Sequence, residues 1–371
     1  MKNNLVEKVS LFQLFILIYI FELGSAVVVG IGGEAKQDAW IAECIGTVCG
    51  VGITGFYVYI LKKLPGKNLF EILIFTFGKW IGRAVIFLYI VYFFYIAARV
   101  LRDFCELMSS TIFEKTPIEV IALTMMMVIV YMIYLGLEVM GRTSEIFIPY
   151  IFSFALIIGL LVFLTGEIEF NNLLPIFGEG FGPILKVVFP GFITFPYGEM
   201  IAFTLIIPYA TKFANAGKTS MIAVLASGIT LVYTMILQLT TLGPEMRERA
   251  NFPTLSAARE ISLLDFIERV DLVVVFIVMF GIIVKVSVFF FGGLKGLEII
   301  FNRPYRTMVV PMGAIIAFIT IVISENYAEH IQEGVKVVPM YLHIPFQFLF
   351  PLTLLPFLIY KIKKQQKEKQ Q

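Results

Sequence analysis

Three charged residues interrupt the apolar stretches of this sequence and are the first candidates for chemistry: Glu22, Glu199 and Lys285. A charge at the centre of a membrane-spanning helix costs roughly 2.5–3.5 kcal/mol on insertion scales, so such residues usually bind something or move a proton. Lys285 lies 14 residues from either end of its apolar stretch, too far to reach the membrane surface. We therefore expect Lys285 to face Glu22 or Glu199 in a buried site. A purely structural salt bridge is the alternative.

The composition places these residues in a polytopic membrane protein. Of 371 residues, 59% are hydrophobic and 15% are charged, against about 45–50% and about 25% in soluble domains. The first apolar run lacks a small-residue cleavage site and is interpreted as a retained span, not a signal peptide. A net charge of +2 indicates no nucleic-acid partner. Cys44, Cys49 and Cys105 lie in or beside apolar runs, so we expect no disulfide framework, no metal site and no cofactor.

Ten apolar runs are long enough to cross a bilayer as helices. They cover about 9–31, 40–61, 83–108, 118–136, 144–165, 184–210, 220–242, 271–299, 306–324 and 341–361. One set of connections, with the C-terminal tail, holds 18 lysines and arginines against 8 in the other set. Because basic connections stay in the cytoplasm, both termini are predicted to be cytoplasmic, which agrees with an even number of spans.

Two of these spans carry clustered helix breakers at matching positions. The breakers are Gly24, Gly30, Gly32 and Gly33 in the first span, and Pro190, Gly191, Pro196 and Gly198 in the sixth. The 174-residue offset from Gly24 to Gly198 predicts two five-helix repeats, about 9–165 and about 184–361, in one membrane domain of residues 1–371. Five is odd, so the second repeat is inverted. Paired breaks of this kind predict a midplane binding site of the transporter type, and simple kinks are the alternative.

The breaks would expose backbone groups of both polarities to a ligand. Free amides near Gly24, Ser25 and Ala26 would hold a carboxylate, and free carbonyls from Ile193 to Phe195 would hold an ammonium. Such a site suits a zwitterion such as an amino acid. Phe195 and Tyr197 would supply apolar walls, and Gly198, with Pro196, would keep the sixth span open. With Tyr95 of the third span, the candidate ligand-binding residues are Gly24, Ser25, Ala26, Tyr95, Ile193, Phe195, Tyr197 and Gly198.

Charged residues also gather at the end of the third span. Tyr92, Tyr95, Arg99, Arg102 and Glu106 share one helical face. The spacing predicts ion pairs of Arg99 with Asp103 and of Arg102 with Glu106. This face either lines an external vestibule or contacts the long connection at about 243–270.

Two further charged clusters have structural interpretations. Arg142 lies between Glu138 and Glu145 and is predicted to fix a turn. Ser262 and Asp265 form a capping-box pattern that predicts a short surface helix before the eighth span. No nucleophile–base–histidine set, P-loop or dinucleotide motif occurs in the sequence, so we do not expect an enzyme.

Several ordered motifs resemble the B subunits of spore-germination nutrient receptors, the GerAB-like family. They are SLFQ, GSAVVVG, DAWIA, LPGKNLFE, VLRDFCE, TPIEVI, GLEVMGRTSE, NNLLPIF, FPYGE, FPTLSAAREI and IERVD, and together they span nearly the whole chain. That family resembles the amino acid–polyamine–organocation transporter superfamily. The resemblance implies an all-α, LeuT-like membrane fold with ten helices in two inverted repeats and broken helices 1 and 6. Gly24-Ser25-Ala26 stands where the superfamily has a GSG-like turn.

The resemblance also implies a function: a nutrient-sensing subunit in the spore inner membrane that works with an A subunit and a lipoprotein C subunit. Many transporters of this fold hold a sodium ion between the first and eighth spans, where Lys285 would replace the cation with a fixed or titratable charge. Two other functions stay open at this point. One is a proton- or cation-coupled amino-acid permease and the other is an ion-conducting pore, because one scaffold hosts several functions.

Overall fold

The computed structural model describes residues 7–166, 168–260 and 271–368, and helices dominate these ranges. Its α-helices are α1 (Leu11–Leu23), α2 (Ala39–Lys62), α3 (Leu69–Thr111), α4 (Ile118–Leu135), α5 (Leu137–Thr165), α6 (Gly182–Lys186), α7 (Phe213–Arg249), α8 (Pro253–Arg259), α9 (Asp271–Phe301), α10 (Val309–Val322), α11 (Tyr327–Gln332) and α12 (Phe350–Glu368).

Short 3₁₀-helical and π-helical segments connect these α-helices or extend them. The 3₁₀ segments are η1 (Gly33–Asp38), η2 (Phe170–Leu173), η4 (Tyr197–Leu205), η5 (Ile207–Tyr209) and η6 (Tyr305–Thr307). The π segments are η3 (Val187–Phe192), η7 (Glu333–Val337) and η8 (Pro339–Leu349). The π segments belong to the sixth and tenth predicted spans. Irregular helix is tolerated at membrane depth only where protein or a wet cavity satisfies its backbone.

Eight helices of the described residues are long and apolar enough to cross a membrane, and the bent pair Val309–Val322 and Tyr327–Val337 raises the number to nine. This pair bends by 107°. The first predicted span is represented by α1, which has only 13 residues before the chain unwinds. The model therefore confirms an all-helical membrane protein, whereas the count of ten spans stays a prediction.

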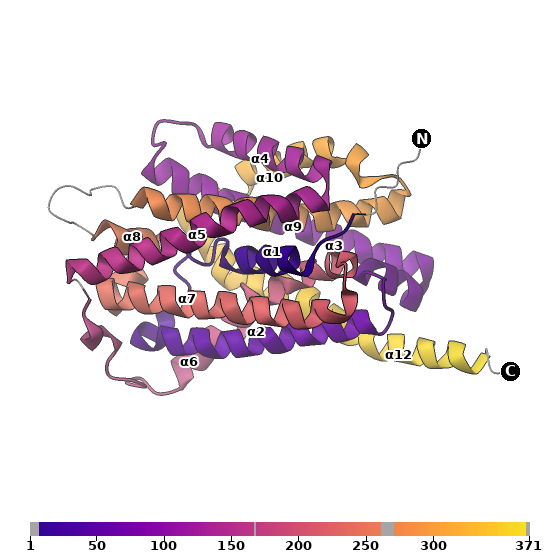
Figure 1. Ribbon diagram of the computed structural model, residues 1–371, viewed down its shortest axis with the longest axis horizontal. Helices are drawn as coiled ribbons and strands as arrows, with labels where there is room; N and C mark the ends of the chain where they lie inside the picture. Colours follow the sequence, from indigo (N-terminus) through magenta and orange to yellow (C-terminus); the bar gives the residue numbers. More distant parts are fainter. Residues whose placement is uncertain (1–6, 167, 261–270, 369–371) are drawn as a thin grey trace.

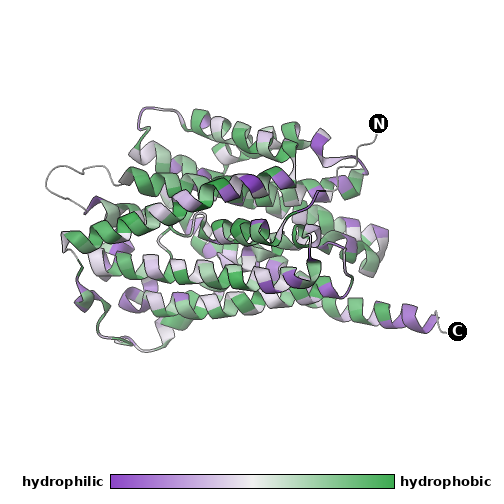
Figure 2. Cartoon of the chain, viewed as in Figure 1, coloured by the Kyte–Doolittle hydropathy of each residue, from purple (hydrophilic) through white to green (hydrophobic). Residues whose placement is uncertain are grey.

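Both chain termini lie at the same end of the molecule (Figure 1). We refer to this end as the terminus side and to the opposite end as the far side. The C-terminal part of α12 extends beyond the bundle there and is hydrophilic (Figure 2). Termini on one side require an even number of crossings. That this side is cytoplasmic stays a prediction from the lysine and arginine count.

The first helix lies at the centre of the bundle and is enclosed by α5, α7 and α9. A helix that is apolar all round is expected in such a position. The α1 ring of Phe21 packs on Phe203 of η4 and Phe289 of α9, with ring centroids 5.0 and 5.2 Å apart. The aromatic core thereby joins the first, sixth and eighth predicted spans.

Two glycines on α9 allow α3 to approach it closely. A β-carbon at Gly293 would overlap the ring of Phe94, and one at Gly296 would lie 2.5 Å from Ile90 Cγ1. In a membrane, close packing of backbones through small residues replaces the hydrophobic driving force between helices. The α3–α9 contact therefore depends on these two positions.

We predict that Gly293→Leu destabilises the fold by about 1–3 kcal/mol, because an overpacked core pushes side chains out of their rotamers. Thermal denaturation of the purified protein in detergent would measure the loss as a lower midpoint. Gly52→Leu is the matched control, since nothing lies within 4 Å of its β-carbon position. Equal midpoints for the two variants would contradict the packing role of Gly293.

Candidate functional site

The first predicted span unwinds at the glycine that ends α1. The helix begins with a capping box between Ser10 and Gln13 and ends at Gly24, whose φ of 17° and ψ of −121° are not helical. The backbone amides of Ser25 and Ala26 have no hydrogen-bond acceptor among the described residues. These are two of the three amides that the sequence assigns to a ligand carboxylate, so the donors are free as predicted, while the ligand itself stays a prediction.

The sixth predicted span changes its helical form twice before it resumes. The π segment η3 passes into a turn at Phe195 and Pro196, after which the 3₁₀ helix η4 begins. The Thr194 hydroxyl donates to the Pro190 carbonyl at 2.7 Å, which holds the turn. The carbonyls of Ile193, Thr194 and Phe195 accept no hydrogen bond from the described residues. Free acceptors thus lie at the sixth break and free donors at the first.

A buried ion pair joins the sixth span to α9. The Nζ atom of Lys285 lies 2.6 Å from Glu199 Oε2, and the two side chains are 0% and 1% exposed. The ammonium also lies 4.3 Å from the Phe195 ring centroid and 5.1 Å from that of Phe21. The pairing of Lys285 with one of the two acids is as the sequence predicts. The other acid, Glu22, is fully buried, and neither of its oxygens has a hydrogen-bond partner among the described residues.

Gly24 lies directly against this ion pair. A β-carbon at Gly24 would be 2.6 Å from Lys285 Cδ, and one at Gly281 would be 2.9 Å from the Gly24 Cα. The missing side chain of Gly24 therefore makes room for Lys285 and for the backbone of α9. The sequence interpretation expected this space to admit a ligand, and the lysine stem fills it.

A cavity of about 80 Å³ lies between the two breaks, the far-side half of α3 and the segment from α11 to η8. Phe195 and Glu199 of the sixth span line it, together with Arg99 and Asp103 of α3 and His330 of α11. A water molecule needs at least about 10–15 Å³ of such space, so the cavity has room for several waters.

The other candidate ligand-binding residues lie around this cavity but do not line it. Ala26 lines a separate space of about 20 Å³, and the Tyr95 hydroxyl accepts a hydrogen bond from Arg99 at 3.4 Å. Tyr197 is not an apolar wall: its ring packs on Gly50 of α2 and its hydroxyl donates to Glu43 Oε1 at 2.6 Å. Gly198 faces the Gln347 side chain. These residues shape the breaks rather than the cavity surface.

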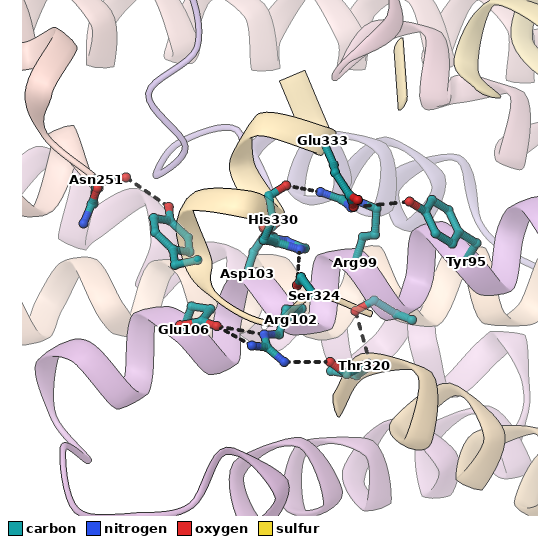
Figure 3. A network of polar contacts seen from close by, with 12 residues as sticks. Tyr95, Arg99, Arg102, Asp103, Glu106, Asn251, Thr320, Ser324, His330 and Glu333 are labelled. Carbon is teal, nitrogen blue, oxygen red and sulfur yellow. Dashed lines mark hydrogen bonds and ion pairs between the residues drawn. The ribbon is translucent and has the colours of Figure 1, made fainter. Parts of the chain in front are cut away.

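A polar network between α3, α10 and α11 borders the cavity (Figure 3). Arg99 contacts Glu333 at 3.2 Å and donates to the His330 carbonyl, and the His330 Nε2 lies 2.8 Å from Asp103 Oδ1. We call these four residues the latch. The predicted pair of Arg99 with Asp103 is therefore wrong, because each residue reaches across to α11 and η7 instead.

A second pair from the same face agrees with the sequence. Arg102 binds Glu106 at 2.7 Å and also donates to the carbonyls that end α10, Thr320 and Ile321. Of the two interpretations of this face, lining the cavity fits Arg99 and Asp103. Nearby, Tyr327 of α11 reaches the 243–270 connection: it donates to the Asn251 carbonyl at 3.1 Å, and its ring centroid lies 5.1 Å from that of Phe252.

The sequence analysis missed a second polar network, which holds the unwound part of the first span. Arg247 donates to the Ile31 carbonyl at 2.7 Å and to Gln238 at 2.9 Å, and Thr254 bonds to the Val27 carbonyl. Glu43 of α2 is buried in the same region. Glu43, an acid within an apolar span, was the one signal for this network in the sequence. Arg247 gave no signal, because it lies in a predicted connection whose fold the sequence does not show.

The tenth span also contributes residues that the sequence did not single out. His343 and Gln347 of η8 share the Tyr92 hydroxyl, at 2.8 and 3.0 Å. The carbonyl of Gln347 accepts from Tyr57 of α2 at 2.8 Å, and that of Phe346 accepts from Tyr89 of α3 at 2.7 Å. Tyr57 and Tyr89 donate to backbone carbonyls that the π segment leaves free. These bonds fix the tenth span beside the cavity.

Two structural predictions lie away from the site. Arg142 pairs with Glu138 at 2.7 Å on the exposed surface. Both residues lie within α5, so the pair stabilises a helix and the prediction that it fixes a turn is wrong. The predicted capping box of Ser262 and Asp265 falls outside the described residues.

Comparisons with known proteins identify the family to which this chain belongs. A family model described as spore germination protein matches residues 8–328. Spore germination protein KB of Bacillus subtilis (strain 168) is 34% identical over 365 residues, which cover 98% of this chain and 97% of that protein. The chain belongs to the spore germination protein family. Another relative, spore germination protein A2 of the same strain, is 29% identical and covers 72% of this chain and 73% of its own length.

Solved structures show which fold this spore germination protein has. MhsT in complex with L-phenylalanine superposes with a TM-score of 0.65 at 10% identity, over 94% of this chain and 98% of that one. Mhp1, a nucleobase-cation-symport-1 family transporter in a closed conformation with bromovinylhydantoin bound, gives a TM-score of 0.63 at 12% identity, over 92% and 82%. The LeuT-like transporter fold implied by the sequence motifs is confirmed, and the likeness shows the fold alone.

We predict that Lys285→Ala lowers stability on the order of 3–5 kcal/mol, because it leaves Glu199 buried without a countercharge. Removing both charges in Lys285→Met with Glu199→Gln should recover most of the loss. The measurements are the amount of protein in the membrane and the thermal midpoint in detergent. A single variant as abundant and as stable as the native protein would show that the pair does not stabilise the fold.

Proposed function

We propose that this chain is the membrane-embedded nutrient-sensing subunit of a spore germinant receptor. The nutrient is a small amino acid that binds in the cavity between the broken spans, and the resulting shift in conformation passes to an A subunit and a lipoprotein C subunit in the spore inner membrane. The observation that carries the proposal is the pair of breaks that flank the cavity. Amides at Ser25 and Ala26 and carbonyls from Ile193 to Phe195 are free there, and of these residues Phe195 lines the cavity in this form. A zwitterion matches both sets.

The charges around the cavity support the same class of ligand. Glu199 and Asp103 line it and favour an ammonium group, whereas Arg99 offers a guanidinium for a carboxylate. Arg99 and Asp103 are held by the latch in this closed form. A ligand that competes for either group would weaken the latch, and this exchange would couple binding to movement of α11. A relative of known fold, MhsT, has been solved with an amino acid bound.

The walls of the cavity suggest how binding would be coupled to movement. His330 of α11 and Gly334 and Val335 of η7 line the cavity, so an amino acid bound there would contact both elements. Glu333 is 39% exposed and Arg99 is 7% exposed, so the latch lies at the protein–water boundary. Ion pairs at such a boundary contribute about 0–1 kcal/mol, so a ligand of modest affinity suffices to open it. The tyrosine contacts to η8 would serve as the fixed end of this movement.

The alternative function is a proton- or cation-coupled amino-acid permease. The buried group of Glu22, Glu199 and Lys285 favours it, because two acids and one lysine leave a place for one further positive charge. Uptake of labelled amino acid into proteoliposomes separates the two functions. Uptake that follows a proton gradient would support the permease, and saturable binding without uptake would support the receptor subunit.

Glu22→Gln tests the site without disturbing a contact in the described structure, since the Glu22 carboxyl has no hydrogen-bond partner there. We expect normal abundance but a germination response that needs at least about tenfold more nutrient, as a lost charged contact of about 1.5 kcal/mol implies. Glu119→Gln, an exposed acid on α4, is the control. Spores of each variant would be titrated with single amino acids, and germination would be followed as the loss of spore refractility.

Two companion variants extend this test. Gly24→Leu should abolish the response, because its side chain would displace Lys285. Glu199→Gln should assemble yet respond weakly, since it removes a charge that both the lysine and the ligand use. Unchanged nutrient sensitivity in Glu22→Gln and Glu199→Gln would remove both carboxylates from the site.

A further inference from the structure

A groove on the outer surface of the bundle lies between α2 and α7, remote from the cavity. It has a volume of about 500 Å³ and occupies the terminus-side half of both helices. Its walls are apolar and include Val51, Val58, Met221 and Leu225. At the terminus-side end, where α2 finishes and α7 starts, it is bordered by Lys62 and Lys218. The groove therefore has one long apolar part and one cationic end.

Glycines create this hollow. A β-carbon at Gly217 would overlap the Val58 side chain, so α7 sits tightly on α2 at the floor of the groove. At Gly55 a β-carbon would only reach the Met221 methyl group, 3.7 Å away, so the wall there is recessed. An apolar hollow that faces lipid must be filled, because atoms lining an empty space lose their dispersion contacts.

The length of the groove matches one leaflet of a bilayer. From Val51 to Lys62 the helix advances eleven residues, or roughly 16 Å at 1.5 Å per residue. Half of the hydrocarbon core is about 15 Å thick. The groove thus extends from the level of the lipid headgroups to about the middle of the membrane, which is the path of one acyl chain.

The two lysines at its end have no acidic partner within the described part of the chain. Neither Lys62 nor Lys218 forms an ion pair within the described residues, and none of the described residues that line the groove is acidic. Lys63, beside them, lies over the Tyr59 ring at 4.2 Å. Basic pockets between membrane helices at the cytoplasmic surface bind anionic lipid headgroups. A phosphate between the two ammonium groups would supply the missing negative charge.

We propose that this groove binds one anionic phospholipid from the leaflet on the terminus side. One acyl chain occupies the apolar groove and the phosphate lies between Lys62 and Lys218. A partner's helix fits less well, because an apolar helix would leave the ammonium groups of Lys62 and Lys218 without a negative charge. The bound lipid would also support α2, whose Tyr57 donates to the Gly198 carbonyl at the sixth break, at 3.2 Å.

The test measures lipid binding by the purified full-length chain with native mass spectrometry and thermal denaturation in neutral detergent. The probes are phosphatidylglycerol, phosphatidylcholine with the same acyl chains, and soluble glycerol phosphate. We expect one tightly retained phosphatidylglycerol and a thermal midpoint that it raises more than phosphatidylcholine does. Glycerol phosphate should have no effect, because the acyl chain is needed.

Three variants locate the binding. Lys62→Gln with Lys218→Gln should weaken phosphatidylglycerol binding about thirtyfold, the equivalent of about 1 kcal/mol for each lysine, and Lys62→Arg with Lys218→Arg should restore it. Gly55→Leu should block the groove and reduce retention of the lipid. The matched control is Lys364→Gln with Lys367→Gln on α12, which removes the same charge outside the groove.

Three results would overturn the proposal. The first is a phosphatidylglycerol effect that persists in the Lys62/Lys218 variant, and the second is equal binding of both phospholipids by the native chain. The third is Gly55→Leu that retains the lipid but no longer assembles with its partner subunits, which would make the groove a protein interface.

Discussion

The buried ion pair between Lys285 and Glu199 is the interaction on which the arrangement of the broken spans depends. Glu199 lies in the first turn of η4, just after the sixth break, and Lys285 stands at the middle of α9, so their contact sets the distance between these elements. Both side chains are buried, and each charge is tolerable in the membrane because the other is present. The unwound first span then fits against the same lysine only because Gly24 has no side chain.

Around the breaks, glycines allow close helix packing and tyrosines donate hydrogen bonds to free backbone groups. Glycines on α2, α7 and α9 let backbones approach, as at Gly217 and Gly293. Tyrosines carry hydroxyl groups to the places where irregular helix leaves polar atoms free, as Tyr57 and Tyr89 do for η8. Without water, every such atom needs a protein partner. The exceptions gather at the two breaks, where the described residues leave donors and acceptors free for a ligand.

The cavity and the latch bear on the proposed sensing function. Under that proposal α11 and η7, which line the cavity and are bent by 107° from α10, are the elements that would move. A ligand shifts a conformational equilibrium only by its differential affinity for the two forms. The proposed movement would therefore occur at the far side, while the Lys285 pair would hold the centre.

The sequence by itself determined the membrane class, the two breaks and the need of Lys285 for a buried acidic partner, because apolar length, helix breakers and the cost of a buried charge are local properties. The structure selected Glu199 over Glu22 as that partner. The sequence also determined Arg102 with Glu106, which are one helical turn apart. Only the tertiary structure decided that Arg99 and Asp103 bind Glu333 and His330, more than 220 positions away in the chain. The same holds for Tyr197 on α2 and for Lys285 filling the space beside Gly24. Contacts between distant segments depend on how the helices pack, and no periodicity within one segment encodes that.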